Sequence, residues 1–193
     1  MRLEVLNSGY SVGTKILFKV IETFSREPLP DAAKLTFYRP DFYGNLMKKI
    51  THEAMRGDSD WSVGERELMA AYVASLNQSQ FCIGAHSATA ALALESEALV
   101  AAVIADLDTA PIDDRLRAAL RMLGTLTREH TVTTDDVREV LDAGATEQQI
   151  MDALAVRFVF NITTRLADAF AFQLLTPDGY TRGANYLLKR GYR

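Results

Sequence analysis

The sequence predicts an all-α fold of about eight or nine helices, and three kinds of observation lead to that prediction. Apolar residues recur at intervals of three and four along most of the chain, whereas the alternating pattern of a strand is hard to find. Capping-box patterns, in which Ser62 precedes Glu65 and Thr146 precedes Gln149, mark two helix starts. Gly144 follows a short periodic segment and is the residue type favoured just beyond a helix end.

The N-terminal part is predicted to form two helices on either side of an irregular segment. The first covers residues 12–24, and the second begins at Pro40 and continues to about residue 55. Residues 26–40 contain three of the five prolines, so we expect them to be irregular. The predicted buried faces comprise Ile16, Leu17, Val20, Ile21 and Phe24 in the first helix and Phe42, Leu46 and Ile50 in the second.

The rest of the chain is predicted to be helical with short polar turns, giving a single domain over residues 1–193. Residues 65–71 resemble residues 147–153, and either a duplicated helical hairpin or chance would explain this similarity. The repeat-like second part covers about residues 112–174. The remaining helices are predicted over residues 62–77, 79–93, 95–107, 111–128, 133–143, 146–174 and 183–189.

Composition and charge exclude several classes of function. The formal net charge is −4 with no run of arginine or lysine, so we expect no nucleic-acid partner. No apolar stretch reaches the roughly 18 residues of a membrane span, and no secretory signal pattern opens the chain, so we expect a soluble cytoplasmic protein without a membrane partner. A single cysteine excludes an internal disulfide and fits a reducing compartment.

That cysteine, Cys82, is the centre of the candidate catalytic site. His86 follows it by four residues and therefore shares its helix face. With Ser79 as the predicted N-cap, Cys82 falls in the first helical turn, where the helix dipole should lower the thiol pKa from its free value of about 8.5. Glu67 lies on the preceding predicted helix among small residues, so a short turn brings it near. The group then offers a nucleophile, a base and an orienting carboxylate.

Structural readings of the same four residues stay open at this point. A lone cysteine on an apolar helix is usually a small buried hydrophobe, and a lone histidine is more often a core or interface residue than a catalyst. Glu67 is equally explained as a solvated helix residue, and Ser79 as a simple N-cap worth about 1 kcal/mol.

Other candidate sites are weaker, and we expect neither a metal nor a cofactor. His52 precedes Glu53 but lacks a second histidine at the spacing of a zinc helix, and His130 is predicted to be exposed between helices. Asn161 and Arg165 share a helix face, where they line a pocket or pair with Asp168, and we interpret them as structural.

The spacing of Glu67, Ser79, Cys82 and His86 resembles the signature of the alkylhydroperoxidase AhpD-like family of the carboxymuconolactone decarboxylase superfamily. In that signature a glutamate precedes a Cys-x-x-Cys pair, and a histidine follows the second cysteine by four residues. The flanking text "ERELMAAYVASLNQSQFCIGAHSATA" is similar to the peroxidase-related subgroup, and the similarity covers roughly residues 28–172. Two departures stand out: Ser79 replaces the first cysteine, and Phe81 stands where some relatives carry a histidine.

The resemblance implies an AhpD-like helical fold, a homo-oligomer and a peroxidase- or peroxiredoxin-type antioxidant oxidoreductase. Because Ser79 prevents a disulfide cycle, Cys82 would react alone: it would attack a peroxide as thiolate, and an external thiol would reduce the sulfenic acid. His86 and Glu67 would serve as proton relay and orienting carboxylate. Two alternatives remain, namely a lactone decarboxylase or isomerase acting on a small organic acid or lactone, and a non-catalytic ligand-binding or assembly protein on the same fold.

Overall fold

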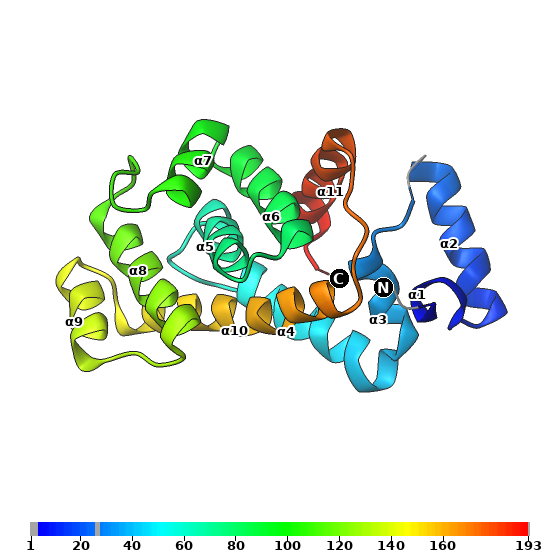
Figure 1. The fold of residues 1–193 in the computed structure, drawn as a ribbon, viewed down its shortest axis with the longest axis horizontal. Helices are drawn as coiled ribbons and strands as arrows, with labels where there is room; N and C mark the ends of the chain where they lie inside the picture. Colours follow the sequence, from blue (N-terminus) through cyan, green and yellow to red (C-terminus); the bar gives the residue numbers. More distant parts are fainter. Residues whose placement is uncertain (1–3, 26–27, 193) are drawn as a thin grey trace.

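The computed structural model describes residues 4–25 and 28–192, and the regular structure within these ranges is helical (Figure 1). No helix in these ranges is long and apolar enough to cross a membrane. In chain order the elements are α1 (Val5–Ser8), α2 (Val12–Ser25), α3 (Asp31–Tyr38), the π-helical turn η1 (Pro40–Gly44), α4 (Asn45–Arg56), α5 (Val63–Leu76), α6 (Gln80–Ala93), α7 (Glu97–Ala105), α8 (Asp114–Glu129), α9 (Thr134–Asp142), α10 (Glu147–Ala169) and α11 (Pro177–Arg190).

The α5–α6 hairpin lies at the centre of the fold. Helix α5 packs against α4, α6, α7, α8 and α10, which is why it is apolar on nearly every side. Figure 1 shows α10 along the length of the molecule, with α8 and α9 at one end and α1 to α3 at the other. Ala70, Ala71 and Ala74 are fully buried in α5, and their small side chains allow the close approach of α6 that the sequence predicts.

The two capping boxes that the sequence predicts are confirmed by their hydrogen bonds. The Ser62 hydroxyl accepts from the Glu65 N–H at 3.1 Å, and the Glu65 carboxylate accepts from the Ser62 N–H at 2.6 Å. Thr146 and Gln149 form the same reciprocal pair at the start of α10. Gly144 has φ +93°, the left-handed conformation that ends α9 and that glycine adopts without strain.

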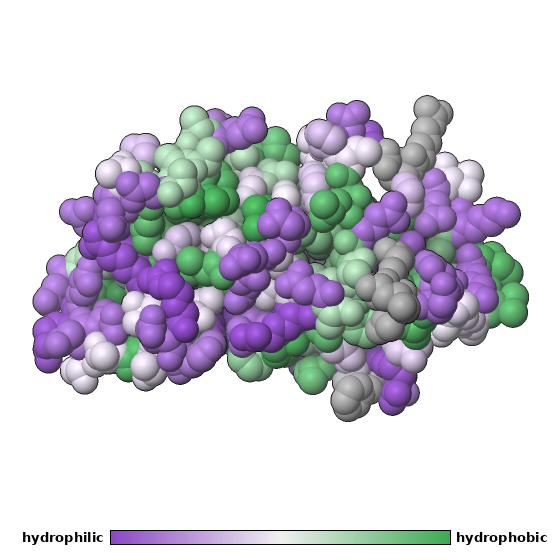
Figure 2. All heavy atoms as spheres, viewed as in Figure 1, coloured by the Kyte–Doolittle hydropathy of each residue, from purple (hydrophilic) through white to green (hydrophobic). Residues whose placement is uncertain are grey.

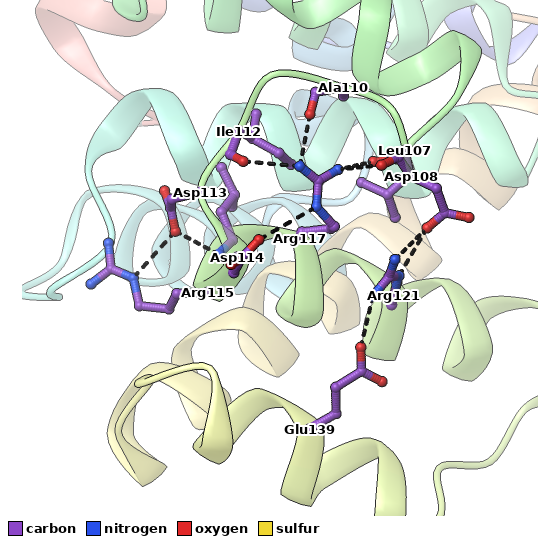
Figure 3. A network of polar contacts seen from close by, with 11 residues as sticks. Leu107, Asp108, Ala110, Ile112, Asp113, Asp114, Arg115, Arg117, Arg121 and Glu139 are labelled. Carbon is purple, nitrogen blue, oxygen red and sulfur yellow. Dashed lines mark hydrogen bonds and ion pairs between the residues drawn. The ribbon is translucent and has the colours of Figure 1, made fainter.

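Two arginines on α8 hold the turn between α7 and α8 through hydrogen bonds and ion pairs (Figure 3). Arg117 on α8 donates to the backbone carbonyls of the turn, including those of Ala110 at 2.8 Å and Ile112 at 3.0 Å. Arg121 lies four residues further along α8 and forms two ion pairs. One is with Asp108 in the α7–α8 turn at 2.7 Å, and the other is with Glu139 on α9 at 2.9 Å. These contacts satisfy carbonyls that the turn leaves without helical partners.

The structure divides the N-terminal part more finely than the sequence predicts. Residues 31–38, predicted to be irregular, form α3, because Pro30 precedes the helix rather than interrupting it. The helix predicted from Pro40 begins as η1, where a Cβ on Gly44 would lie 1.8 Å from the Thr36 carbonyl oxygen. Glycine alone permits this close approach, and the apolar periodicity carries no sign of it.

Two other predictions need correction. Helix α10 is continuous over residues 147–169, so the segment that resembles part of α5 is not the first arm of a second hairpin. Helix α11 begins at Pro177 and is longer than the predicted short helix at 183–189.

The predicted apolar face of α2 is largely solvent-exposed. Ile16 is 60% exposed and Val20 47%, whereas Phe18 is buried on the opposite side against the rings of Tyr10 and Phe37. Figure 1 places α2 at the edge of the molecule, and Figure 2 shows hydrophobic surface at that end. In the second predicted face, Leu46 is also exposed and Ile50 packs against the core. The side chains of Phe24 and Phe42 lie outside the described residues.

Candidate active site

The α5–α6 hairpin brings Glu67 and His86 together, as the sequence predicts. Glu67 is 0% exposed, and its Oε2 lies 2.8 Å from His86 Nδ1. Its other oxygen accepts hydrogen bonds from Arg56 Nη2 at 2.7 Å and from the Tyr192 hydroxyl at 2.9 Å. The solvated-residue reading of Glu67 is therefore wrong, and its carboxylate is the hub of a buried polar cluster.

The hydrogen bonds of this cluster keep Glu67 ionised. Burial by itself would raise the pKa of Glu67, but the bonds and charges of His86 and Arg56 outweigh it and hold the pKa below its ordinary value. An ionised carboxylate can only accept, so the proton of the short contact resides on His86 Nδ1. Nε2 is therefore the ring nitrogen left for proton transfer, while the ring packs edge-on against Phe160 at 4.3 Å between centroids.

Arg56 and Tyr192 are site residues that the sequence analysis did not identify. Arg56 ends α4, and its guanidinium lies over the Tyr192 ring, 5.2 Å from the centroid. Gly191, at φ +67°, turns the chain after α11, and a Cβ there would lie 2.6 Å from the His52 ring. This turn directs Tyr192 back to Glu67 from 125 residues away, a distance at which no local pattern gives a signal.

Cys82 is the third residue of α6, within the first turn as predicted, but its thiol is not activated as predicted. The side chain is 1% exposed, and burial raises the pKa of the thiol to about 12, with a smaller contribution from the Asp168 charge and an opposing one from a hydrogen bond with Ser79. A pKa near 12 leaves roughly one thiol in 10⁵ ionised at pH 7. The prediction that the helix N-terminus lowers the pKa of the Cys82 thiol is therefore wrong, because desolvation of the thiolate outweighs the effect of the helix dipole.

Ser79 occupies the N-cap position of α6 but does not act as a side-chain cap. Its hydroxyl makes no hydrogen bond to the first turn and instead donates to Asp168 Oδ1 at 2.9 Å, with the Thr164 carbonyl oxygen at 3.4 Å. Asp168, considered from the sequence as a partner of Asn161 or Arg165, thus bonds to the residue that replaces the first cysteine. The simple-cap reading of Ser79 is wrong for its side chain.

Aromatic and aliphatic side chains surround the Cys82 thiol. Tyr180 from α11 packs over Gly84, where a Cβ would lie 2.5 Å from the tyrosine ring. Tyr43 is close enough to Cys82 that its pKa, raised to about 12 chiefly by burial, is also raised by the thiolate charge. The thiol belongs to an apolar cluster of buried residues formed by Leu6, Leu35, Ala74, Phe81, Ala167 and Phe172. A substrate therefore reaches Cys82 only when part of this cover, which includes α11, moves aside.

The other histidines stay outside the cluster around the thiol. His130 is exposed at the C-terminal end of α8, as predicted. His52 contacts the chain end, where its Nδ1 accepts from the Tyr192 N–H at 3.3 Å.

The raised pKa of Cys82 predicts a loss of stability at high pH. The thiol of the unfolded chain loses its proton near pH 8.5, whereas the folded thiol keeps its proton up to about pH 12. Raising the pH through this window therefore favours the unfolded state. We expect the melting temperature of the parent to fall more steeply between roughly pH 8.5 and pH 10.5, the lower part of this window, than that of Cys82→Ala, in which the buried tyrosines still titrate. Equal slopes would show that the thiol is not protected.

Comparison with known proteins gives a family match and similar folds. Residues 41–125 match the Carboxymuconolactone decarboxylase family. The structure is similar to an uncharacterized peroxidase-related protein from Silicibacter sp. TM1040 (TM-score 0.76, 23% identity, 91% of each chain covered). It is also similar to an alkylhydroperoxidase AhpD core protein, described as an uncharacterized peroxidase-related protein, from Ralstonia eutropha JMP134 (TM-score 0.75, 20% identity, 93% of each chain covered).

A third similar structure is the debrominase Bmp8, with a TM-score of 0.69, 15% identity, and coverage of 90% of this chain and 92% of that one. No match was found among curated proteins. At these identities the structural similarity establishes the AhpD-like fold, and the chemistry has to be argued from this chain's own residues.

Proposed function

Because residues 41–125 match the carboxymuconolactone decarboxylase family and the chain has the AhpD-like fold, we propose that it is a peroxidase with a single reactive cysteine, Cys82. The observation that carries the proposal is the buried Glu67–His86 pair, which lies one helical turn from the thiol. An oriented histidine beside a thiol is the arrangement that activated-cysteine chemistry requires. The names of the two peroxidase-related structures support the same class.

The proposed reaction oxidises the sulfur and reduces the peroxide. The Cys82 sulfur attacks one peroxide oxygen, the O–O bond breaks, and Cys82 becomes a sulfenic acid. The Nε2 of His86 accepts the thiol proton as the sulfur attacks and delivers it to the departing oxygen, which leaves as alcohol or water, while Glu67 holds the ring through Nδ1.

The return to the thiol requires an external reductant, because Ser79 cannot form a disulfide. A first molecule of a small external thiol attacks the sulfenic acid, giving a mixed disulfide and water. A second molecule then releases Cys82 and leaves as the external disulfide. The homo-oligomer implied by the family resemblance belongs to the same proposal, and sedimentation velocity at several protein concentrations tests it.

A second candidate function is the decarboxylation or isomerisation of a small lactone. The observation that favours it is the thiol pKa of about 12, which makes Cys82 a poor nucleophile at neutral pH. Glu67, His86 and Tyr192, in contrast, form a set of acid–base groups that could act without the thiol. The same closed site is also compatible with ligand binding without turnover.

Peroxide treatment in the presence of a sulfenic-acid trap tests the proposal. We expect cumene hydroperoxide with dimedone to add one label to the Cys82 peptide in the parent protein, measured by mass spectrometry. With a monothiol reductant, the parent should consume peroxide, and Cys82→Ser should remain at the background rate. Lactone turnover that survives in Cys82→Ser would favour the second function, and the absence of both activities would leave only a binding role.

A further inference from the structure

We infer that residues 174–192, which include α11, form a lid that opens as a unit to expose Cys82, and that the hydrogen bond from the Tyr192 hydroxyl to Glu67 holds this lid closed. The inference goes beyond the proposed peroxidase function, because it concerns access to the buried thiol and not the reaction there. It gives Tyr192 a role in controlling that access.

The lid lies against the part of α6 that carries the thiol. Figure 1 shows α11 beside α6, and within the described part of the chain α6 is the one helix against which α11 packs extensively. The Tyr180 ring contacts Gly84 and lies 6.3 Å from the Phe81 ring between centroids, so it touches residues on both sides of Cys82 in the sequence. Leu175, just before α11, packs against the apolar cluster that contains Cys82. Movement of the lid therefore removes two side chains from the surroundings of the thiol.

Little apolar surface holds the lid in place. The buried residues of α11 are Gly179 and Ala184, which have the smallest side chains, whereas the larger Tyr186 is 56% exposed. Most of the stability of a helix within a protein comes from the apolar face that it buries. We therefore expect α11 to open at a lower free-energy cost than the core helices α5 and α8.

A hinge lies directly before the lid. Phe172 is buried, and the Gln173 N–H donates to the buried Asp31 carboxylate at 2.8 Å, so the chain is fixed to α3 up to this point. Residues 174–176 have no regular structure, and Leu174 is 56% exposed. A short irregular segment beside a fixed point can absorb the backbone rotation of a moving element.

Hydrogen bonds to α4 and α5 hold the other end of the lid. The Tyr192 hydroxyl donates to Glu67 Oε1 at 2.9 Å, and its N–H donates to His52 Nδ1 at 3.3 Å. The Leu187 carbonyl accepts from Arg56 Nη2 at 3.1 Å. The bond to Glu67 is the shortest of these and has a charged acceptor, so we expect it to contribute most.

Opening of the lid leaves no buried charge without a partner. When Tyr192 withdraws, Glu67 keeps its ion pair with Arg56 at 2.7 Å and its contact with His86 at 2.8 Å. These three residues belong to α4, α5 and α6, outside the lid. The withdrawn phenol bonds to water instead, which makes its release much less costly than the rupture of a buried ion pair. The lid can therefore open while the Glu67–His86 pair stays assembled.

The test compares Tyr192→Phe with the matched control Tyr186→Phe, which removes an exposed hydroxyl from the same helix. Phenylalanine at 192 keeps a ring over Arg56 and loses only the hydroxyl. The measurements are the rate at which iodoacetamide alkylates Cys82 in the folded protein and the hydrogen exchange of the α11 amides, followed by mass spectrometry. In Tyr192→Phe we expect both rates to rise about tenfold or more, as for loss of a hydrogen bond to a charged group. Tyr186→Phe should match the parent in both.

Urea distinguishes opening of the lid from unfolding of the whole chain. A local opening exposes little surface, so in the parent both rates should rise only slightly at urea concentrations below the unfolding transition. Exchange of the amides of residues 118–123, in the buried part of α8, should rise steeply over the same range, because it requires global unfolding.

Three outcomes would overturn the inference. Parental rates in Tyr192→Phe would show that its hydroxyl does not hold the lid closed. Faster exchange in α11 without faster alkylation would show that α11 does not control access to the thiol. Alkylation with the same urea dependence as exchange in α8 would show that Cys82 is reached only by global unfolding. None of these measurements uses peroxide, so each failure leaves the proposed function to its own test.

Discussion

Replacement of Glu67 by leucine is expected to lower the free energy of unfolding by about 3–5 kcal/mol, the range for removal of one partner from a buried ion pair. The carboxylate is fully buried, and the Arg56 side chain is only 10% exposed. Without Glu67, the guanidinium keeps its charge between α4, α5 and α11 with no anion beside it. His86 and the Tyr192 hydroxyl lose their partner at the same time. Urea denaturation followed by circular dichroism measures the change.

Two further variants sharpen this prediction. Glu129→Leu, at an exposed position near the end of α8, should change the free energy of unfolding by no more than about 0.5 kcal/mol. Glu67→Gln keeps the volume and one accepting oxygen, so it should cost less than Glu67→Leu while lowering the peroxidase rate several-fold. A loss below about 1 kcal/mol in Glu67→Leu would contradict the view that Arg56 depends on this carboxylate.

Local signals in the sequence predicted the part of the site that lies within one hairpin. The Ser62 capping box fixes the start of α5, and the short turn before Ser79 fixes the start of α6. Given these two helices, the stripe of small residues on α5 brings Glu67 close to His86. Each of these features depends on residues fewer than twenty positions apart, where periodicity and capping are informative.

The rest of the site depends on contacts between distant segments. Tyr192 reaches Glu67 only because Gly191 turns the chain after α11, and Arg56 arrives from α4. Asp168 meets Ser79 because α10 packs beside the α5–α6 turn. No local pattern encodes these meetings, so sequence analysis placed Asp168 with its helical neighbours instead.

The thiol pKa was predicted in the wrong direction for a related reason. A helix N-terminus offers an anion about 0.3–1 kcal/mol at an exposed site, and this contribution was visible in the sequence. The opposing desolvation comes from residues such as Leu6, Leu35 and Phe172, which lie far from Cys82 along the chain. Their burial around the thiol is a property of the tertiary fold, and it outweighs the local effect.

Substitution of Ser79 by cysteine is expected to convert the site to two-cysteine chemistry. Ser79 has extended backbone angles, φ −84° and ψ 93°, and Cys82 is the third residue of the helix that Ser79 precedes. A sulfur in place of the hydroxyl oxygen therefore lies close to the Cys82 sulfur, within reach of a disulfide. The cost is the bond to Asp168, about 1.5–3 kcal/mol for a hydrogen bond to a charged group, which a folded domain tolerates.

The expected results are an internal disulfide after mild oxidation and a gain of peroxide turnover with a dithiol reductant. The introduced thiol resolves the sulfenic acid of Cys82 within the same molecule, so the slow encounter with an external thiol is no longer needed. Mass spectrometry should show the loss of two hydrogens, as for one disulfide, and no thiol left to alkylate. Ser87→Cys is the matched control, because residue 87 lies on another face of α6 and its thiol should stay free. If both thiols of Ser79→Cys remain open to alkylation after peroxide, residue 79 does not hold the place of the first cysteine, and the peroxidase proposal loses its structural basis.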